Sequence, residues 1–309
     1  MKLSIVVPCY NEEEVLLETI PKLTHLLTDL IDKQKISADS NVYFVDDGST
    51  DSTWNLIVDA ARKETSVRGV KLSRNQGHQA ALSAGLFTAD GDVVVSMDAD
   101  LQDEVAVTEE MVDAASQGFE IVYGVRKRRQ TDSFLKRFTA EGYYHLLGWL
   151  GVDVVFNHAD SRLLSRRSVE ALKRYREVNL FLRGIIPLLG FRTAHVYYDR
   201  HERAAGVSKY PMSKMVAFAL DGVTSFSAFP LRLITILGLI VFAGSMGLGL
   251  WVLFTRLYGS YVPGWASTVI PIYSLGGIQL LSIGVIGEYL AKIHTEVKAR
   301  PRYHIEKTV

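Results

Sequence analysis

The chain has 309 residues, of which 48% are hydrophobic and 22% charged, and its 34 basic and 34 acidic side chains give a formal net charge of zero. This length allows one large domain with an appendage or two modest domains, and without net charge no whole-molecule field favours a nucleic-acid partner. The single cysteine, Cys9, excludes an internal disulfide and is expected to be a buried thiol in a reducing compartment. Because MKLSIVVPCYNEEE turns acidic after a short apolar stretch, we expect no signal peptide.

Short apolar runs alternate with helical patterns over residues 1–125, which is typical of a parallel sheet with crossover helices. Asn11 is expected to cap the helix that follows the first run. Each expected strand ends in polar or acidic residues, and ligands of open α/β sheets bind at that carboxyl edge. The expected strands are LSIVVP (3–8), VYFVDDGS (42–49), VRGVKLS (67–73), DVVVSMD (92–98) and GFEIVYGVR (118–126).

The stretch MDADLQD places Asp98 and Asp100 one residue apart at a strand end. Strand side chains alternate with a period of two, so both carboxylates are expected to point the same way and to share one magnesium ion, with Gln102 adding a neutral oxygen. A solvated acidic turn is the alternative for so short a motif. A second acidic strand end, at Asp46 and Asp47, is expected on the same edge, and the two pairs together predict a nucleotide site.

Two uncharged runs of 22 residues, 233–254 and 266–287, change the character of the chain. At 1.5 Å per residue each would extend about 33 Å, against a hydrocarbon core of about 30 Å. A buried core helix is the alternative for either run alone, whereas two in tandem favour a transmembrane hairpin. The cations outside the runs predict, by the positive-inside rule, a cytoplasmic-membrane protein with both termini cytosolic. These cations are Arg232, Lys292, Lys298, Arg300 and Arg302.

Residues 208–230 join the two parts and mix lysines with apolar residues at helical spacing. This pattern predicts an interfacial amphipathic helix, with an ordinary surface helix as the alternative. The expected organisation is therefore an α/β domain over 1–207, the linker helix over 208–230, and the hairpin with a basic tail over 231–309.

Five motifs occur in a fixed order: SIVVPCYNEEE, VDDGSTDST, SRNQGHQAALSAG, MDADLQD and RAAGVSKY. In this order they resemble inverting family 2 glycosyltransferases of the GT-A fold. With the hairpin and the ending GGIQLLSIGVIGEYLAKIHTEVKARPRY, nearly the whole chain is similar to the polyprenyl-phosphate glycosyltransferases, which include bactoprenol glucosyltransferases and dolichol-phosphate mannose synthases. The resemblance implies inverting, metal-dependent hexose transfer to polyprenyl phosphate at the cytosolic membrane face, for cell-envelope glycosylation. The implied donor is UDP-glucose, UDP-N-acetylglucosamine or GDP-mannose.

The resemblance also implies a role for each matching residue on the donor side. Asp98, Asp100 and Gln102 would hold magnesium or manganese on the diphosphate, where the metal acts as Lewis acid and template. Asp47 would accept a hydrogen bond from the base, unless it is only a turn residue that caps Ser49 and the next helix. The segment RHERAAGVSKY would be a mobile loop that closes over the diphosphate, with a solvated basic stretch as the alternative. The implied nucleotide-sugar residues are Pro8, Tyr10, Glu12, Asp47, Arg203, Ser208 and Lys209.

The cation-rich stretch VRKRRQTDSFLKRF is expected to face the acceptor. Arg126 and Arg137 match family positions that grip the acceptor phosphate, and the planar fork of arginine suits phosphate oxygens. Lys127, Arg128 and Arg129 are expected to attract anionic headgroups or to form a solvated face.

The stretch FNHADSRLLSRRSV aligns Asp160 with the catalytic base proposed for the family. Ala159 and Ser161 replace a common glycine and phenylalanine, so the local geometry departs from the family pattern. A phosphate monoester is already mostly deprotonated at neutral pH, which leaves two roles open for Asp160, proton abstraction or positioning of a substrate. His158 has no metal-like partner at short spacing and is expected to be structural.

Three alternatives to this function remain, two of them enzymes and one a non-catalytic protein. A processive polysaccharide synthase of the same fold would usually carry Q-x-x-R-W and more spans, and the sequence has neither. Transfer to a lipopolysaccharide, polymer or protein acceptor would need product analysis to distinguish. A non-catalytic nucleotide-sugar sensor would lose some of the acids or arginines, all of which are present. The sequence leaves open the sugar, the acceptor chain and whether the chain forms a homo-oligomer, which close packing of its small residues would allow.

Overall fold

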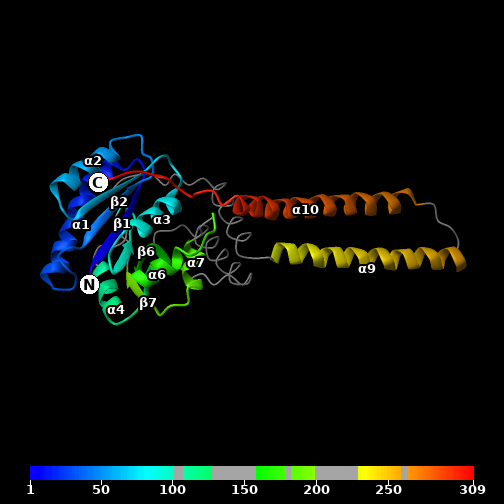
Figure 1. The fold of residues 1–309 in the computed structure, drawn as a ribbon. Helices are drawn as coiled ribbons and strands as arrows, with labels where there is room; N and C mark the ends of the chain where they lie inside the picture. The colour runs from blue at the N-terminus through cyan, green and yellow to red at the C-terminus, as the bar shows by residue number, and fades with distance from the viewer. Residues whose placement is uncertain (101–106, 127–157, 179–181, 199–228, 259–263) are drawn as a thin grey trace. The chain divides into compact units, whose positions relative to one another are not determined.

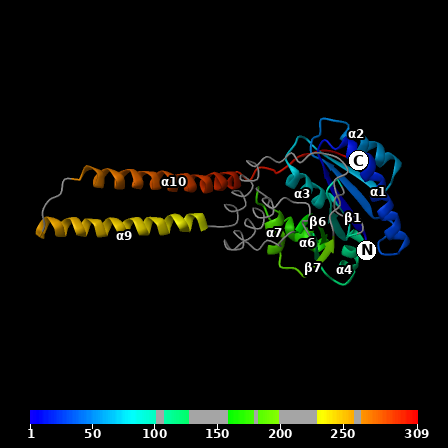
Figure 2. The same ribbon diagram turned by 180° about the vertical axis from the view of Figure 1, so that it is seen from behind.

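The computed structural model describes residues 1–100, 107–126, 158–178, 182–198, 229–258 and 264–309. The chain divides into two units (Figures 1 and 2). The first comprises Met1–Gly148, Asp153–Tyr210 and Ala299–Val309, and the second Trp149–Val152 and Pro211–Lys298.

An eight-stranded sheet in the order β7-β5-β6-β4-β1-β2-β3-β8 forms the centre of the first unit. Its strands are β1 (Leu3–Cys9), β2 (Asn41–Asp46), β3 (Val67–Leu72), β4 (Val93–Ser96), β5 (Ile121–Arg126), β6 (His158–Ser165), β7 (Thr193–Tyr198) and β8 (Ile305–Thr308). The helices of this unit are α1 (Glu13–Asp32), α2 (Thr53–Lys63), α3 (His78–Thr88), α4 (Val107–Ser116), α6 (Arg166–Leu172) and α7 (Leu182–Leu188).

The middle of the sheet is parallel, since β1 pairs in parallel with β2 and β4, and β2 with β3. Every residue of β1, β2 and β4 is buried, which explains their nearly continuous apolar runs, because parallel strands are covered on both faces. Each strand expected from the sequence overlaps an observed one, so the mostly parallel α/β sheet is confirmed.

Three strands were not expected, and two of them pair in the opposite direction. β6 lies antiparallel between β4 and β5, and β8 lies antiparallel beside β3. β7 extends the sheet in parallel beyond β5. The tail after the second long apolar run therefore returns to the first unit as an edge strand.

The expectation that Asn11 caps the first helix is wrong. Helix α1 begins at Glu13 with Glu12 at the N-cap position and no capping side-chain hydrogen bond. Asn11 has a positive φ of 53°, which asparagine tolerates better than most residues. Its side chain instead accepts the N–H of Thr50 at 2.9 Å, in the loop after β2.

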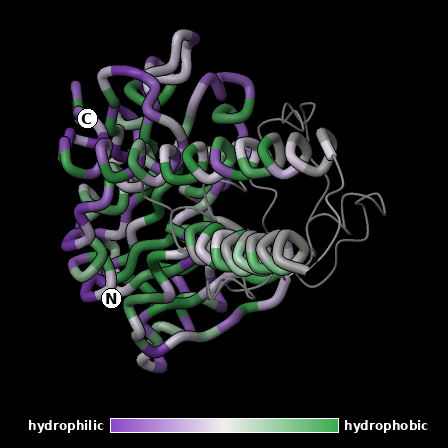
Figure 3. Tube along the Cα trace, turned by 90° about the vertical axis from the view of Figure 1, so that its right-hand side faces the viewer, coloured by the Kyte–Doolittle hydropathy of each residue, from purple (hydrophilic) through white to green (hydrophobic). Residues whose placement is uncertain are grey.

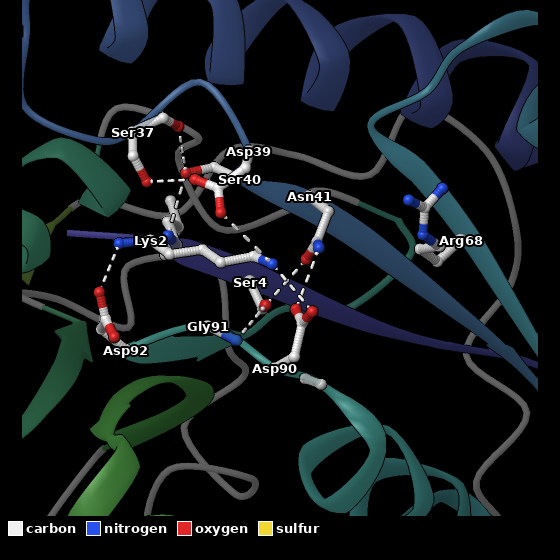
Figure 4. Close-up of polar contacts among 12 residues, drawn as sticks. Lys2, Ser4, Ser37, Asp39, Ser40, Asn41, Arg68, Asp90, Gly91 and Asp92 are labelled. Carbon is white, nitrogen blue, oxygen red and sulfur yellow. Dashed lines mark hydrogen bonds and ion pairs between the residues drawn. The ribbon is translucent and has the colours of Figure 1, made fainter.

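A polar cluster lies at the edge of the sheet where β1, β2 and β4 begin (Figure 4). It is called here the amino-edge network and comprises Lys2, Ser4, Asn41, Asp90 and Gly91. Lys2 Nζ lies 2.8 Å from Asp90 Oδ2, and Asn41 Nδ2 donates to the other oxygen of that carboxylate at 3.2 Å. Ser4 Oγ donates to Asn41 Oδ1 at 2.8 Å and accepts the N–H of Gly91 at 2.9 Å. Because Ser4 and Asn41 are buried, these bonds satisfy groups that would otherwise destabilise the fold.

Two long helices, α9 (Phe229–Tyr258) and α10 (Trp265–Val297), lie side by side in the second unit. Along both of them hydrophobic residues alternate with less hydrophobic ones (Figure 3). Over the described residues, neither helix nor any other combines the length and hydropathy needed to cross a bilayer. The spans expected at 233–254 and 266–287 are therefore not supported, and the linker helix expected over 208–230 lies outside the described residues.

Candidate active site at the carboxyl edge of the sheet

The loops that follow β1 and β2 are locked together at the carboxyl edge, where these strands end. The N–H of Asn11 donates to Ser49 Oγ at 2.9 Å. In the other direction, the N–H of Thr50 donates to Asn11 Oδ1 at 2.9 Å. The N–H of Glu12 donates to Thr53 Oγ1 at 2.9 Å. Such reciprocal bonds fix the two loops relative to each other, which a binding site requires.

A second set of bonds extends the same junction to the start of α2. Asp51 accepts the N–H of Thr53 at 3.0 Å and of Glu13 at 3.3 Å, while Glu13 Oε2 accepts the N–H of Ser52 at 3.0 Å. Burial alone would raise the pKa of Asp51, but bonds from Thr53 and the Glu13 backbone hold it below its usual range. These contacts between loops were not expected from the sequence, although the density of Ser, Thr and Asp after β2 was a turn signal.

Asp47 connects the end of β2 to the loop before α3. Its two carboxylate oxygens accept the backbone N–H groups of Gln76 at 2.8 Å and Gly77 at 2.9 Å. Burial raises the pKa of Asp47, and the two N–H bonds only partly oppose this rise. Gly48 lets the two loops approach, because a Cβ there would lie 2.5 Å from the carbonyl carbon of Arg74. Asp47 thus sits in a loop junction, and its bond to the nucleotide base stays a prediction.

The alternative role for Asp47 was to cap Ser49 in the turn after β2. Asp46 has this role instead. Its Oδ1 accepts the N–H of Ser49 at 3.0 Å, and its side chain is fully buried. Beside it, Cys9 is 2% exposed, and burial, followed by the charges of Glu12 and Asp46, raises the thiol pKa well above its ordinary value. The expectation of a buried thiol is confirmed, and a raised pKa disfavours the thiolate, which is the reactive form.

The Asp98-Ala99-Asp100 turn follows β4 after one residue, Met97. Met97 and Ala99 are 2% and 6% exposed, whereas both aspartates are partly exposed. This is the predicted alternation, and it leaves Asp98 and Asp100 accessible. His78, the first residue of α3, places its Nε2 4.0 Å from Asp98 Oδ1, so the start of α3 and the turn after β4 meet at the same edge.

The residue types of this turn fit a hard divalent cation. Magnesium accepts one or two protein carboxylates and completes its shell with waters and phosphate oxygens. Asp98 and Asp100 supply these carboxylates, while Gln102 lies outside the described residues. Within the described ranges, no group of three or more His, Cys, Asp or Glu side chains could hold a metal by itself. A cation here would depend on substrate phosphates or on Gln102 for its remaining ligands.

β6 brings Asp160 to the same edge, which the sequence did not show. β6 runs antiparallel to β4, and Ser96 is the register partner of Arg162. Asp98 lies two residues after Ser96, just beyond β4, and Asp160 lies two residues before Arg162, within β6, so both acidic positions lie at the carboxyl edge. Arg126 ends β5 at this edge as well.

Arg162 is a functional candidate that the sequence analysis missed. It is 1% exposed and heads the largest fully buried side chains of the described chain. Arginine is almost never fully buried unless it is paired. Its register partner on β5 is Tyr123, whose pKa burial raises to about 12 while the Arg162 charge pulls in the other direction. A single cation directly before two leucines in DSRLLS was the available signal.

The remaining predicted residues divide between described and undescribed parts of the chain. Pro8 is buried within β1, and Tyr10, just after it, is 45% exposed. The predicted residues outside the described ranges, whose roles stay predictions, are Gln102, Lys127, Arg128, Arg129, Arg137, Arg203, Ser208 and Lys209.

Comparison with known families agrees with the site. Residues 4–173 match the family model described as "Glycosyl transferase family 2". The chain belongs to glycosyl transferase family 2. This family 2 glycosyltransferase is 51% identical over 306 residues to the uncharacterized glycosyltransferase YkoT of Bacillus subtilis, covering 98% of the chain and 91% of that relative.

Other relatives carry names that state an acceptor. A bactoprenol glucosyl transferase of Shigella phage SfII is 40% identical over 310 residues, covering 100% of this family 2 glycosyltransferase and 98% of the relative. Among solved structures, the mannosyltransferase PcManGT of Pyrobaculum calidifontis, in complex with GDP-Man and Mn2+, superposes with a TM-score of 0.50 at 17% identity. That alignment covers 96% of this chain and 85% of the other, and the similarity shows the GT-A fold.

Proposed function

We propose that this family 2 glycosyltransferase transfers a hexose from a nucleotide-diphosphate sugar to polyprenyl phosphate. Full-length similarity to bactoprenol glucosyl transferases, at 40% identity, is the observation that carries the acceptor class. The same names make glucose the first sugar to test, ahead of N-acetylglucosamine and mannose.

The donor would bind across the loops that follow β1, β2 and β4. Asp98 and Asp100 would hold Mg²⁺ or Mn²⁺, which when bound neutralises charge on the diphosphate. The Asp47 carboxylate already accepts two backbone N–H bonds and keeps further lone pairs for an N–H of the base. In this arrangement the Asp98-Ala99-Asp100 turn would contact the diphosphate, and the loop after β2 would contact the nucleoside.

The acceptor phosphate would attack the sugar directly. One of its oxygens forms the new bond to the anomeric carbon while the bond to the diphosphate oxygen breaks on the opposite face, which inverts the anomeric centre. The attacking oxygen is already largely deprotonated, so we assign Asp160 to positioning rather than to proton abstraction. Arg126, at the end of β5, and Arg137 would hold the remaining phosphate oxygens.

The place of reaction would be the cytosolic face of the cytoplasmic membrane, because a long isoprenoid acceptor stays in the bilayer. The chain leaves the first unit before α9 and returns to it after α10 as β8, which supports placing both ends of that segment on one side. Protease digestion of sealed inverted vesicles tests this, since the sheet unit should then be cleaved.

Purified full-length protein, incubated with each radiolabelled nucleotide sugar, a short polyprenyl phosphate and Mn²⁺ or Mg²⁺, tests the reaction. Label from UDP-glucose should partition into the organic phase as a polyprenyl-phosphate sugar, and the double variant Asp98→Asn/Asp100→Asn should not produce it. Absence of lipid-linked label with all three donors would overturn the acceptor assignment. Label in polymer, protein or lipopolysaccharide would support the rival acceptors, and donor binding without any transfer would support a sensor.

A further inference from the structure

Thr19 of α1 lies beneath the turn that carries the two metal-site aspartates. Its side chain is buried, with 1% exposure. Its Oγ1 lies 2.7 Å from the carbonyl oxygen of Ala99, 80 residues away in sequence, and 3.0 Å from that of Val15 in its own helix. The hydroxyl thus links α1 to the middle residue of the Asp98-Ala99-Asp100 turn.

The other two threonines of α1, Thr24 and Thr28, bond to carbonyls of their own helix. Thr28 Oγ1 donates to the Thr24 carbonyl at 3.1 Å, four residues earlier in the helix. This local bond is common for helical threonine and does not help to fold the protein. A hydroxyl has one hydrogen, and in Thr19 the shorter contact is the one that leaves the helix.

The Ala99 carbonyl belongs to the peptide that joins Ala99 to Asp100. Ala99 is 6% exposed, so this carbonyl has little access to water, and a buried acceptor without a donor is unfavourable. The bond from Thr19 therefore fixes the orientation of the peptide between the two aspartates. A rotation of this peptide would move the Asp100 carboxylate relative to that of Asp98.

We propose that Thr19 is a positioning residue that holds the Asp98 and Asp100 carboxylates at the spacing that one divalent cation needs. The proposal rests on the proposed function in one respect, that a metal ion binds at this turn. Thr19 itself contacts neither metal nor substrate. It acts through the Ala99 carbonyl.

Three variants separate positioning from a general packing role. Thr19→Val has nearly the same shape but no hydroxyl, Thr19→Ser keeps the hydroxyl and loses a methyl group, and Thr28→Val removes a hydroxyl from the same helix without reaching the turn. A packing role predicts that Thr19→Ser is the more damaging of the two Thr19 variants. A positioning role predicts the opposite.

Electron paramagnetic resonance of free Mn²⁺, titrated into the purified full chain with UDP present, measures the metal affinity without turnover. Thr19→Val should weaken Mn²⁺ binding about tenfold, whereas Thr19→Ser and Thr28→Val should stay within about threefold of the wild type, at matched folded fractions. Equal affinity of Thr19→Val and the wild type would overturn the proposal, as would a wild type that does not bind Mn²⁺. If Thr19→Val alone is weakened but the wild type transfers no sugar, the proposed function fails while this inference stands.

Discussion

At the amino edge of the sheet, the Asp90 carboxylate is held by the side chains of Lys2 and Asn41, whereas at the carboxyl edge the Asp47 carboxylate is held by two backbone N–H groups. The pKa values of the two groups move in opposite directions. Burial alone would raise the pKa of Asp90, but bonds from Lys2 and Asn41 lower it overall, while burial dominates at Asp47 and raises its pKa.

The difference lies in the partners and the exposure of the acids at the two edges. A carboxylate with a lysine partner is neutralised within the protein and contributes to folding. Asp47 is held by neutral backbone N–H groups but is 3% exposed, whereas Asp98 and Asp100 are partly exposed and can attract a cation from solution. The same sheet therefore carries an amino edge whose acid is paired within the protein and a carboxyl edge whose partly exposed acids we propose for binding.

The largest effect is expected from the double variant Asp98→Asn/Asp100→Asn. Its kcat/KM should fall about 1,000-fold, or about 4 kcal/mol, because the metal and its charge stabilisation are lost. Its melting temperature should be equal to or above that of the wild type, because two like charges are removed. Retention of more than about a tenth of wild-type kcat/KM would place the metal elsewhere.

Next in size is Gly48→Ala at the carboxyl edge. Gly48 has a φ of 67°, and its added Cβ would lie 2.5 Å from the Arg74 backbone, so the variant must strain or move the loop before α3. We expect a loss of about 3 kcal/mol in unfolding free energy and a raised KM for the donor. Gly77→Ala is the matched control, since Gly77 has a φ of 91° but no atom within 4 Å of the added Cβ; it should cost about 1 kcal/mol. Equal losses in urea titrations would show that loop contact is unimportant.

A smaller effect, confined to stability, is expected at the amino edge from Asn41→Ala. Asn41 is 4% exposed and bonds to Ser4 and Asp90, so the variant should lose about 2 kcal/mol of unfolding free energy. Its kcat/KM should stay within about twofold of the wild type. Asn55→Ala on the exposed face of α2 is the control and should change stability by less than about 0.5 kcal/mol. A large catalytic defect in Asn41→Ala would remove the distinction between the edges.

The smallest effect is the pH dependence of the two carboxylates. Asp90 has a lowered folded pKa, so its stabilisation is present above the unfolded value of about 3.9 and is lost as the pH falls through the folded pKa. Asp47 has a raised folded pKa, so its contribution is present below the unfolded value and is lost as the pH rises through the folded one. Carboxyl ¹³C NMR should show Asp90 titrating below Asp47, with Asp90→Asn and Asp47→Asn assigning the signals. The reverse order would contradict the comparison.

The sequence predicted the features that depend on local periodicity. Apolar runs located the first five strands, and alternation placed Asp98 and Asp100 on one side with Met97 and Ala99 buried. Partners that lie far apart in sequence were not predictable in this way. β6 looked polar, and Asn11 was read as a cap because its partner Thr50 lies 39 residues away. The buried Arg162 was missed for the same reason.

The last residue of the chain is part of the sheet. Val309 exchanges two backbone hydrogen bonds with Gly69, at 2.8 and 2.9 Å, and its Cγ2 fills the space where a Gly69 side chain would stand. An affinity tag fused after Val309 would therefore emerge directly from a paired strand, and removal of β8 would leave the β3 backbone open to pairing with other chains. Truncations that remove β8 should therefore be screened for precipitation first.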